Sequence, residues 1–154
     1  MRIAVCRYPL QTLAGFSAFA EKQAILLQEV VNQGATLAVL PEYLALEIAG
    51  GFAEHVRGDL AASLVALQPW FGSWQECYQN LADQFGICIQ AGTFLLAQEG
   101  GRYRNRAFLF RPLATPLWQD KLQLTGFEKQ CGLIEGGDSL HVFDVQGQRC
   151  GMAV

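Results

Sequence analysis

The stretch "TLAVLPE", residues 36–42, decides the fold of this chain. It is apolar at every position from 37 to 40, which is typical of a β-strand that is covered on both faces. Upstream, the run "RIAVC" at 2–6 predicts a first strand. Between the two runs, the apolar residues of segment 16–33 recur at intervals of three and four, which indicates an amphipathic helix. The chain therefore begins as strand, helix, strand.

The middle of the chain predicts two helical pieces that are interrupted near Pro69 and Gly72, followed by a strand over 87–97. A Gly100-Gly101 turn then joins that strand to the next β-type run. The expected helix N-caps are Ser17, Asp59 and Ser73, and the expected helix stops are Gly34 and Gly86. Shorter β-type runs lie at 115–119, 140–144 and 149–154.

Strands that alternate with helices, followed by strands joined through hairpins, predict an α/β fold with a mixed sheet. We expect residues 1–154 to form a single domain. Open sheets of this kind place their chemistry beyond the carboxyl ends of strands. The residues that follow "TLAVL", "PLWQ" and "GMAV" are therefore the first candidates for a site.

The composition narrows the class of protein. The chain is 51% hydrophobic and 16% charged, with a net charge of -3, which is typical of a folded domain with a large core. Its Lys and Arg residues are scattered, so we expect neither a nucleic acid nor a membrane surface as partner. The odd number of widely spaced cysteines favours reduced thiols and a cytoplasmic location, and the isolated His55 and His141 favour no metal site.

Glu42 is the first candidate catalytic residue. It directly follows the apolar strand and so should lie at the rim of the sheet, where partial loss of water suits a carboxylate to act as a general base. A solvated glutamate in a turn is the alternative. Glu47 and Glu54 lack this placement and are expected to be solvated.

Lys121 and Glu128 are the next candidates, in "DKLQLTGFE" just after a β-type run. A lysine held near a carboxylate in a partly dry cleft can stabilise a developing oxyanion and favour the thiolate form of a nearby cysteine. The alternative is a solvated lysine in a surface ion pair that contributes little.

Three segments, taken in order and with their spacing, resemble the nitrilase or carbon–nitrogen hydrolase superfamily. They are "GATLAVLPEY" at 34–43, "QDKLQLTGFEKQCGLIEGGDSLHVFDVQG" at 119–147 and "QRCGMAV" at 148–154. The opening "IAVCRYP" and the run "YRNRAFLF" are similar to the first strand and the Asn-containing strand of that family. The resemblance covers essentially the whole chain, and it implies an α/β fold of the nitrilase type, an αββα sandwich of mixed sheets flanked by helices.

The resemblance also implies a catalytic set of a Glu, a Lys and a Cys, with a second Glu near the Lys. Glu42 would be the general base, Lys121 would stabilise the tetrahedral intermediate, and Glu128 would orient the lysine or the substrate. In the family the nucleophile directly follows a strand of Gly and three mostly apolar residues, here residues 151–154. We therefore expect the catalytic cysteine to come after Val154 and the domain to be incomplete at its C-terminus.

The cysteines within the chain are weaker candidates for the nucleophile. Cys150 precedes the expected position and is interpreted as a packing residue, while Cys131 could approach the site but lacks a strand-to-turn context. Cys6, Cys77 and Cys88 lie in apparent core elements.

The function that the resemblance implies is hydrolysis of a non-peptide amide, or a related nitrile, through a cysteine thioester, with no cofactor or metal. The substrate is a small molecule whose identity stays open, and a homodimer or higher homo-oligomer is expected. Two alternatives are an N-acyltransferase that uses the same site and a non-catalytic binding protein with the same fold.

Overall fold

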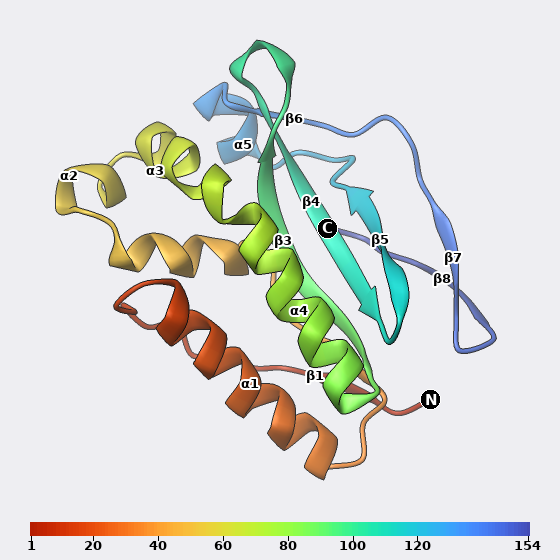
Figure 1. Cartoon of the computed structure of the whole chain (residues 1–154). Helices are drawn as coiled ribbons and strands as arrows, with labels where there is room; N and C mark the ends of the chain where they lie inside the picture. The colour runs from red at the N-terminus through yellow and green to blue at the C-terminus, as the bar shows by residue number, and fades with distance from the viewer.

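The computed structural model describes residues 1–154 (Figure 1). The strands are β1 (Ile3–Val5), β2 (Leu37–Val39), β3 (Cys88–Ala97), β4 (Tyr103–Arg111), β5 (Ala114–Asp120), β6 (Ile134–Glu135), β7 (Val142–Val145) and β8 (Gln148–Gly151). The α-helices are α1 (Phe16–Asn32), α2 (Glu54–Arg57), α3 (Leu60–Leu67), α4 (Phe71–Phe85) and α5 (Gly126–Cys131). Three 3-10 helices complete the inventory: η1 (Leu44–Gly51), η2 (Gln68–Trp70) and η3 (Glu99–Gly101).

The main sheet is mixed and has the order β1-β2-β3-β4-β5, with the short β6 paired to β4. β1, β2 and β3 run parallel, whereas β3, β4 and β5 form an antiparallel meander. Strand β5 therefore points the same way as β2. Because strands of the same direction end at the same edge of a sheet, the residues that follow β2 and β5 lie at a common edge.

The helices α1 and α4 cover one face of this sheet (Figure 1). The contact is dominated by Trp74 of α4, which is fully buried and packs edge-on or tilted against Phe94, Phe108 and Phe110 of β3 and β4. Burial of such large aromatic side chains supplies most of the driving force that joins the helical layer to the sheet.

The β7–β8 hairpin is a separate two-stranded sheet on the opposite face of the main sheet (Figure 1). Val145 of β7 packs there against Cys88 and Leu109. The predicted fold class is thereby confirmed: the chain is α/β, with a mixed sheet flanked by helices and a second β layer on its other face.

Two of the three predicted N-caps are wrong. Asp59 caps α3 as expected, since its carboxylate accepts a hydrogen bond from the Ala62 N–H. Ser17 and Ser73 instead lie inside α1 and α4, whose caps, Gly15 and Trp70, provide no side-chain hydrogen bond. The physical reason at Ser73 is that the backbone is already helical before it, since α4 follows η2 and Trp70 has right-handed helical angles. At α1 the helix begins one residue before Ser17, at Phe16, whose ring stacks on Trp70 with the centroids 5.3 Å apart.

The predicted strand over 149–154 is shorter in the structure. Strand β8 ends at Gly151, because its partner β7 begins at Val142, which pairs with Gly151. Residues 152–154 have no strand partner and are partly exposed, so they do not form the buried strand that their apolar sequence predicts.

Glu47 is not solvated, contrary to the prediction. Its carboxylate is 1% exposed, because η1 turns it beneath α1 to accept hydrogen bonds from the Tyr8 hydroxyl, the Gln11 N–H and Lys22 Nζ. Glu54, by contrast, is exposed as expected. The sequence gives no sign of this buried cluster, because its members come from three separate segments.

Candidate active site

The three predicted site residues meet at the edge where β2 and β5 end. Glu42 follows β2 and Lys121 follows β5 directly, while Glu128 is on α5. Lys121 Nζ lies 2.7 Å from Glu42 Oε1 and 3.2 Å from Glu128 Oε2. The side chains of Lys121 and Glu128 are 5% and 1% exposed, whereas that of Glu42 is 36% exposed. The structure thus gives one buried cation two carboxylate partners, of which only Glu42 reaches solvent.

A capping box on α5 places Glu128. Thr125 is the N-cap residue: its side chain accepts from the Glu128 N–H, and its own N–H and hydroxyl donate to Glu128 Oε2 at 2.7 and 2.9 Å. Burial by itself would raise the pKa of Glu128, but hydrogen bonds from Tyr43, Thr125 and Lys121 lower that pKa to about 2. Glu128 is therefore an ionised anchor for Lys121 rather than a group poised to exchange protons.

Lys121 is held in its charged form. Burial opposes the charge, but hydrogen bonds and charge attraction from Glu42 and Glu128 outweigh burial, so the pKa of Lys121 is raised above its ordinary value. A lysine with this pKa is a fixed positive charge at neutral pH. It can stabilise an oxyanion, and it is unsuited to act as a general base.

Tyr43 and Asn105 are site residues that the sequence reasoning did not single out. The Tyr43 hydroxyl donates to Glu128 Oε1, and burial together with that carboxylate raises the pKa of Tyr43. Asn105 on β4 donates to Glu42 Oε1 at 2.6 Å. Neither contact has a local sequence signal, because each joins segments that lie far apart in the chain. The Thr125-x-x-Glu128 spacing of a capping box, in contrast, is visible in the sequence.

A close approach of two strands fixes the backbone around Glu42. Gly92, in an irregular part of β3, has φ +70, and a side chain there would place its Cβ 2.1 Å from the Pro41 carbonyl oxygen. Just beyond, the Tyr43 N–H donates to Thr93 Oγ1 at 2.8 Å. Only glycine allows the turn that carries Glu42 to lie so close to β3.

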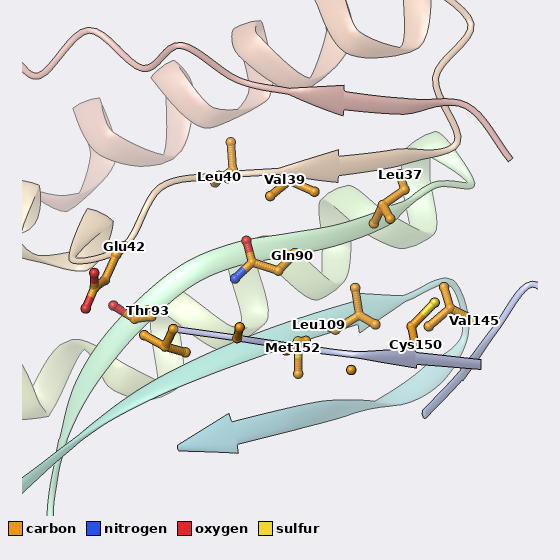
Figure 2. A pocket seen from close by; sticks show the side chains of 13 residues that line it. Leu37, Val39, Leu40, Glu42, Gln90, Thr93, Leu109, Val145, Cys150 and Met152 are labelled. Carbon is orange, nitrogen blue, oxygen red and sulfur yellow. The ribbon is translucent and has the colours of Figure 1, made fainter. Parts of the chain in front are cut away.

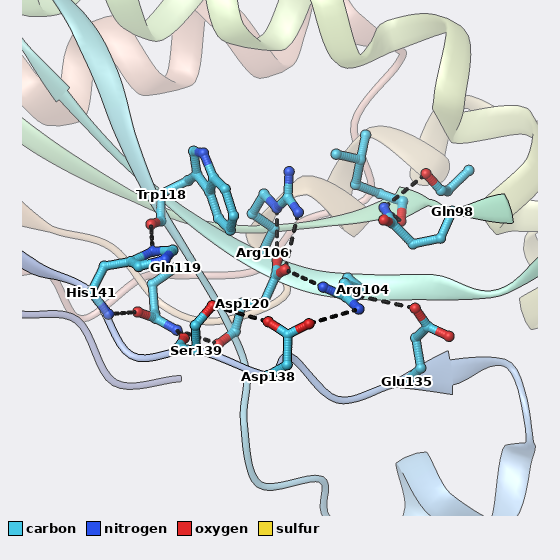
Figure 3. A network of polar contacts seen from close by, with 12 residues as sticks. Gln98, Arg104, Arg106, Trp118, Gln119, Asp120, Glu135, Asp138, Ser139 and His141 are labelled. Atoms are coloured by element: carbon cyan, nitrogen blue, oxygen red, sulfur yellow. Dashed lines mark hydrogen bonds and ion pairs between the residues drawn. The ribbon is translucent and has the colours of Figure 1, made fainter.

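A salt-bridge network next to the site holds β4 and β5 in register (Figure 3). Arg106 Nε and Arg104 Nη1 lie 2.6 and 3.2 Å from the two carboxylate oxygens of the buried Asp120. Asn105 lies between the two arginines in sequence, and Lys121 follows Asp120. Because successive residues of a strand face opposite sides, the arginines lie on one face of β4 and Asn105 lies on the other. The network thereby holds Asn105 beside Lys121, and the Lys121 N–H donates to the Asn105 carbonyl at 2.9 Å.

A cavity of about 280 Å³ opens beside Glu42 (Figure 2). One wall is formed by apolar residues of β2 and β4 with Gln90 and Thr93 of β3, and the other wall is formed by residues 150–154. The Glu42 carboxylate lies toward one end of this space (Figure 2). A molecule in the cavity could therefore meet both the carboxylate and the segment that ends at Val154.

None of the five cysteine thiols makes a hydrogen bond to the carboxylate of Glu42 or Glu128, although Cys150 lines the cavity. All five thiols are free. Burial raises the pKa of Cys77 to about 11 and also raises those of Cys6 and Cys88, which disfavours their thiolates. Cys131 donates to the backbone oxygen of Glu128 at 3.2 Å, and Cys150 packs with the cluster around Val145.

Two further findings concern the whole chain. No group of three or more His, Cys, Asp or Glu side chains is placed to hold a metal ion. None of the helices is both long enough and apolar enough to cross a membrane.

Comparison with known proteins finds one curated relative by sequence. No family model matches the chain. It is 27% identical over 144 residues to the probable hydrolase YhcX of Bacillus subtilis (strain 168), an alignment that covers 94% of this chain and 27% of that protein.

Solved structures match more closely in shape than in sequence. A carbon–nitrogen hydrolase from Helicobacter pylori G27 superposes with a TM-score of 0.67 at 16% identity, covering 88% of this chain and 44% of that one. An amidase from Nesterenkonia sp. AN1, in complex with acrylamide, superposes with a TM-score of 0.67 at 18% identity, covering 99% and 55%. A CN-hydrolase superfamily protein from Xanthomonas campestris, with an arsenic adduct in its active site, gives 0.66 at 20% identity, covering 90% and 47%.

The chain thus spans about a quarter of the curated relative and about half of these solved structures. At these identities the comparisons establish the fold, and they confirm the resemblance that the sequence predicts. The chain has the fold of the carbon–nitrogen hydrolase, or nitrilase, superfamily.

Proposed function

We propose that this chain carries the Glu–Lys part of an amidase-type active site. The reaction is hydrolysis of a small, non-peptide amide or related C–N bond through a cysteine thioester. Glu42 is the general base, Lys121 stabilises the oxyanion, and Glu128 orients Lys121. The nucleophile is a cysteine that follows Val154 in the complete protein.

One observation carries this proposal: a buried ammonium group, Lys121 Nζ, lies 2.7 Å from a carboxylate that is partly open to a cavity. A buried Lys–Glu pair alone would be structural. Here the second carboxylate, Glu128, is buried away from the cavity and balances the charge of Lys121. Glu42 is therefore the carboxylate that can exchange a proton with a molecule in the cavity.

The steps follow from this arrangement. Glu42 takes the proton of the thiol, and the thiolate attacks the amide carbon, while the ammonium of Lys121 and backbone N–H groups stabilise the oxyanion. Glu42 then returns the proton to the leaving nitrogen, and ammonia or an amine departs as the C–N bond breaks. Water, deprotonated by Glu42, attacks the thioester; the C–S bond breaks and the proton returns to the thiol.

The relatives support this choice. The curated relative is described as a probable hydrolase, and among the solved structures is a glutamate-to-glutamine mutant of the Nesterenkonia amidase, in which acrylamide has added to the active-site cysteine. Because the chain covers about half of that amidase, the activity is proposed for the complete protein. A homodimer and a cytoplasmic location are part of the same proposal.

The test uses the full-length protein and a panel of small aliphatic amides, with ammonia release as the measurement. Glu42→Gln should lower kcat about 10³-fold, because a glutamine cannot accept the proton. Glu54→Gln, an exposed glutamate on α2, is the matched control and should leave kcat unchanged.

Thiol labelling with iodoacetamide provides the second measurement. One cysteine should react faster than the buried ones, and Glu42→Gln should slow it. Product formation that requires an added amine would indicate an acyltransferase instead. Uniformly slow labelling together with no turnover of any amide would refute both enzyme functions and favour a binding protein.

A further inference from the structure

Two different side chains bridge the same pair of carboxylates at the candidate site. Lys121 Nζ contacts Glu42 Oε1 at 2.7 Å and Glu128 Oε2 at 3.2 Å. The amide nitrogen of Asn105 contacts the same Glu42 oxygen at 2.6 Å and Glu128 Oε1 at 3.3 Å. The four side chains therefore form a closed ring in which each carboxylate accepts from one cation and one neutral amide.

The position of Asn105 in this ring is fixed. Its side chain is fully buried, and its amide oxygen has no hydrogen-bond partner in the protein. If the amide were rotated by half a turn, its oxygen would face two carboxylates, which have no hydrogen to donate, and its N–H groups would lose both acceptors. The fold leaves a buried acceptor without a partner, which is unfavourable in itself. Both amide hydrogens are thereby directed at Glu42 and Glu128.

The two carboxylate oxygens of Glu42 differ in their hydrogen bonds. Oε1 accepts from both Lys121 and Asn105, whereas Oε2 makes no hydrogen bond within the protein. Since Glu42 is the exposed member of the set, Oε2 is the oxygen that is free to meet a molecule in the cavity.

We propose that Asn105 is a positioning residue, which holds Glu42 by Oε1 so that Oε2 is the oxygen that takes the proton. This inference rests on the proposed function. The amide is suited to the task because Lys121 alone must balance two negative charges. A second donor without charge holds Glu42 beside Glu128 without adding a second cation, which would stabilise the ionised carboxylate and make it a weaker base.

The test compares three substitutions of Asn105 in the full-length protein. Asn105→Leu keeps the approximate volume and removes both donors, and it should lower kcat about 10²-fold with KM within about threefold. Asn105→Thr retains one donor and should lose about tenfold. Asn105→Asp replaces the donors with a third carboxylate and should lose the most.

Gln23→Leu is the matched control. Gln23 is also a fully buried amide, and it donates to the Tyr8 hydroxyl on the other side of the sheet, far from the cavity. It should lose thermal stability and keep kcat. If kcat follows thermal stability across all four variants instead of the number of donors at position 105, the positioning role is wrong.

Crystal structures of the wild type and of Asn105→Leu test the same point without activity. The Glu42 carboxylate should lose its single orientation in Asn105→Leu while Glu128 stays in place. An unchanged Glu42 would overturn the inference. If the wild type hydrolyses no amide and yet Glu42 moves in Asn105→Leu, the proposed function fails, and only the structural part of the inference stands: Asn105 holds Glu42 by Oε1.

Discussion

The molecule contains two buried glutamates that are held in almost the same way. The edge cluster consists of Glu128, Lys121 and Tyr43, and the helix-side cluster consists of Glu47, Lys22 and Tyr8. In each, a carboxylate that is 1% exposed pairs with the lysine, at 3.2 Å in the edge cluster and 2.6 Å in the helix-side cluster. In each, the tyrosine hydroxyl donates to the same carboxylate.

The clusters differ in what else the lysine meets. Lys22 donates a second hydrogen bond to the Pro9 carbonyl at 2.5 Å and contacts no second carboxylate. Lys121 instead contacts Glu42, which is partly exposed and borders a cavity. A buried Glu–Lys–Tyr cluster by itself therefore indicates only a role in stability. A second carboxylate that stays in contact with solvent makes it a candidate site.

Replacing each lysine in turn should reveal the largest difference between the two clusters. Lys121→Met removes the charge that would stabilise an oxyanion and should lower kcat for amide hydrolysis about 10³-fold. Lys22→Met removes an equally well-paired lysine and should change kcat less than about twofold. Kinetics of the two variants of the full-length protein measure the difference; similar losses of kcat would mean that the helix-side cluster is also part of the site.

Removing the charge of Glu47 should produce the next largest effect, on stability. Glu47→Gln leaves Lys22 without its carboxylate and should lower the free energy of unfolding by about 3 kcal/mol, the lower end for a broken buried pair, because Lys22 is partly exposed. Urea unfolding measures this change. A decrease in unfolding free energy of less than about 1 kcal/mol would mean that the helix-side cluster contributes no more to stability than an exposed ion pair does.

The edge cluster should also make stability depend on pH. The pKa of Glu128 is about 2 in the folded chain and 4.5 ordinarily, so the folded state favours the ionised form. This contribution is fully present above pH 4.5 and is lost as the pH falls toward 2. Urea midpoints measured from pH 6 to pH 3 should fall for the wild type, and Glu128→Gln should remove that part of the slope. An identical slope in the variant would contradict the anchored, ionised Glu128.

The two tyrosines give the smallest and most selective test. Tyr43→Phe and Tyr8→Phe each remove one hydrogen bond to a buried carboxylate and should each lower the free energy of unfolding by about 1.5 kcal/mol. Only Tyr43→Phe should also lower kcat, since Glu128 contacts Lys121 and Glu47 does not. Paired unfolding and kinetic measurements would show whether the two effects separate in this way.

The sequence by itself predicted the strand, helix, strand start of the fold, the candidate general base Glu42 and the candidate oxyanion-stabilising cation Lys121. The apolar run before Glu42 and the β-type run before Lys121 identified two strand ends, and parallel strand direction requires such ends to share an edge. The capping-box spacing of Thr125 and Glu128 is equally local. These features are readable because each depends on residues that are close together in the chain.

The tertiary structure alone decided which polar residues join these candidates. Asn105 lies beside Lys121 because β4 pairs in one register with β5, and Gly92 matters because β3 passes directly beside Pro41. The same reasoning left Glu47 as a solvated residue, although folding buries it against Lys22. Contacts between segments far apart in the chain depend on packing and strand register, which the pattern of neighbouring residues does not encode.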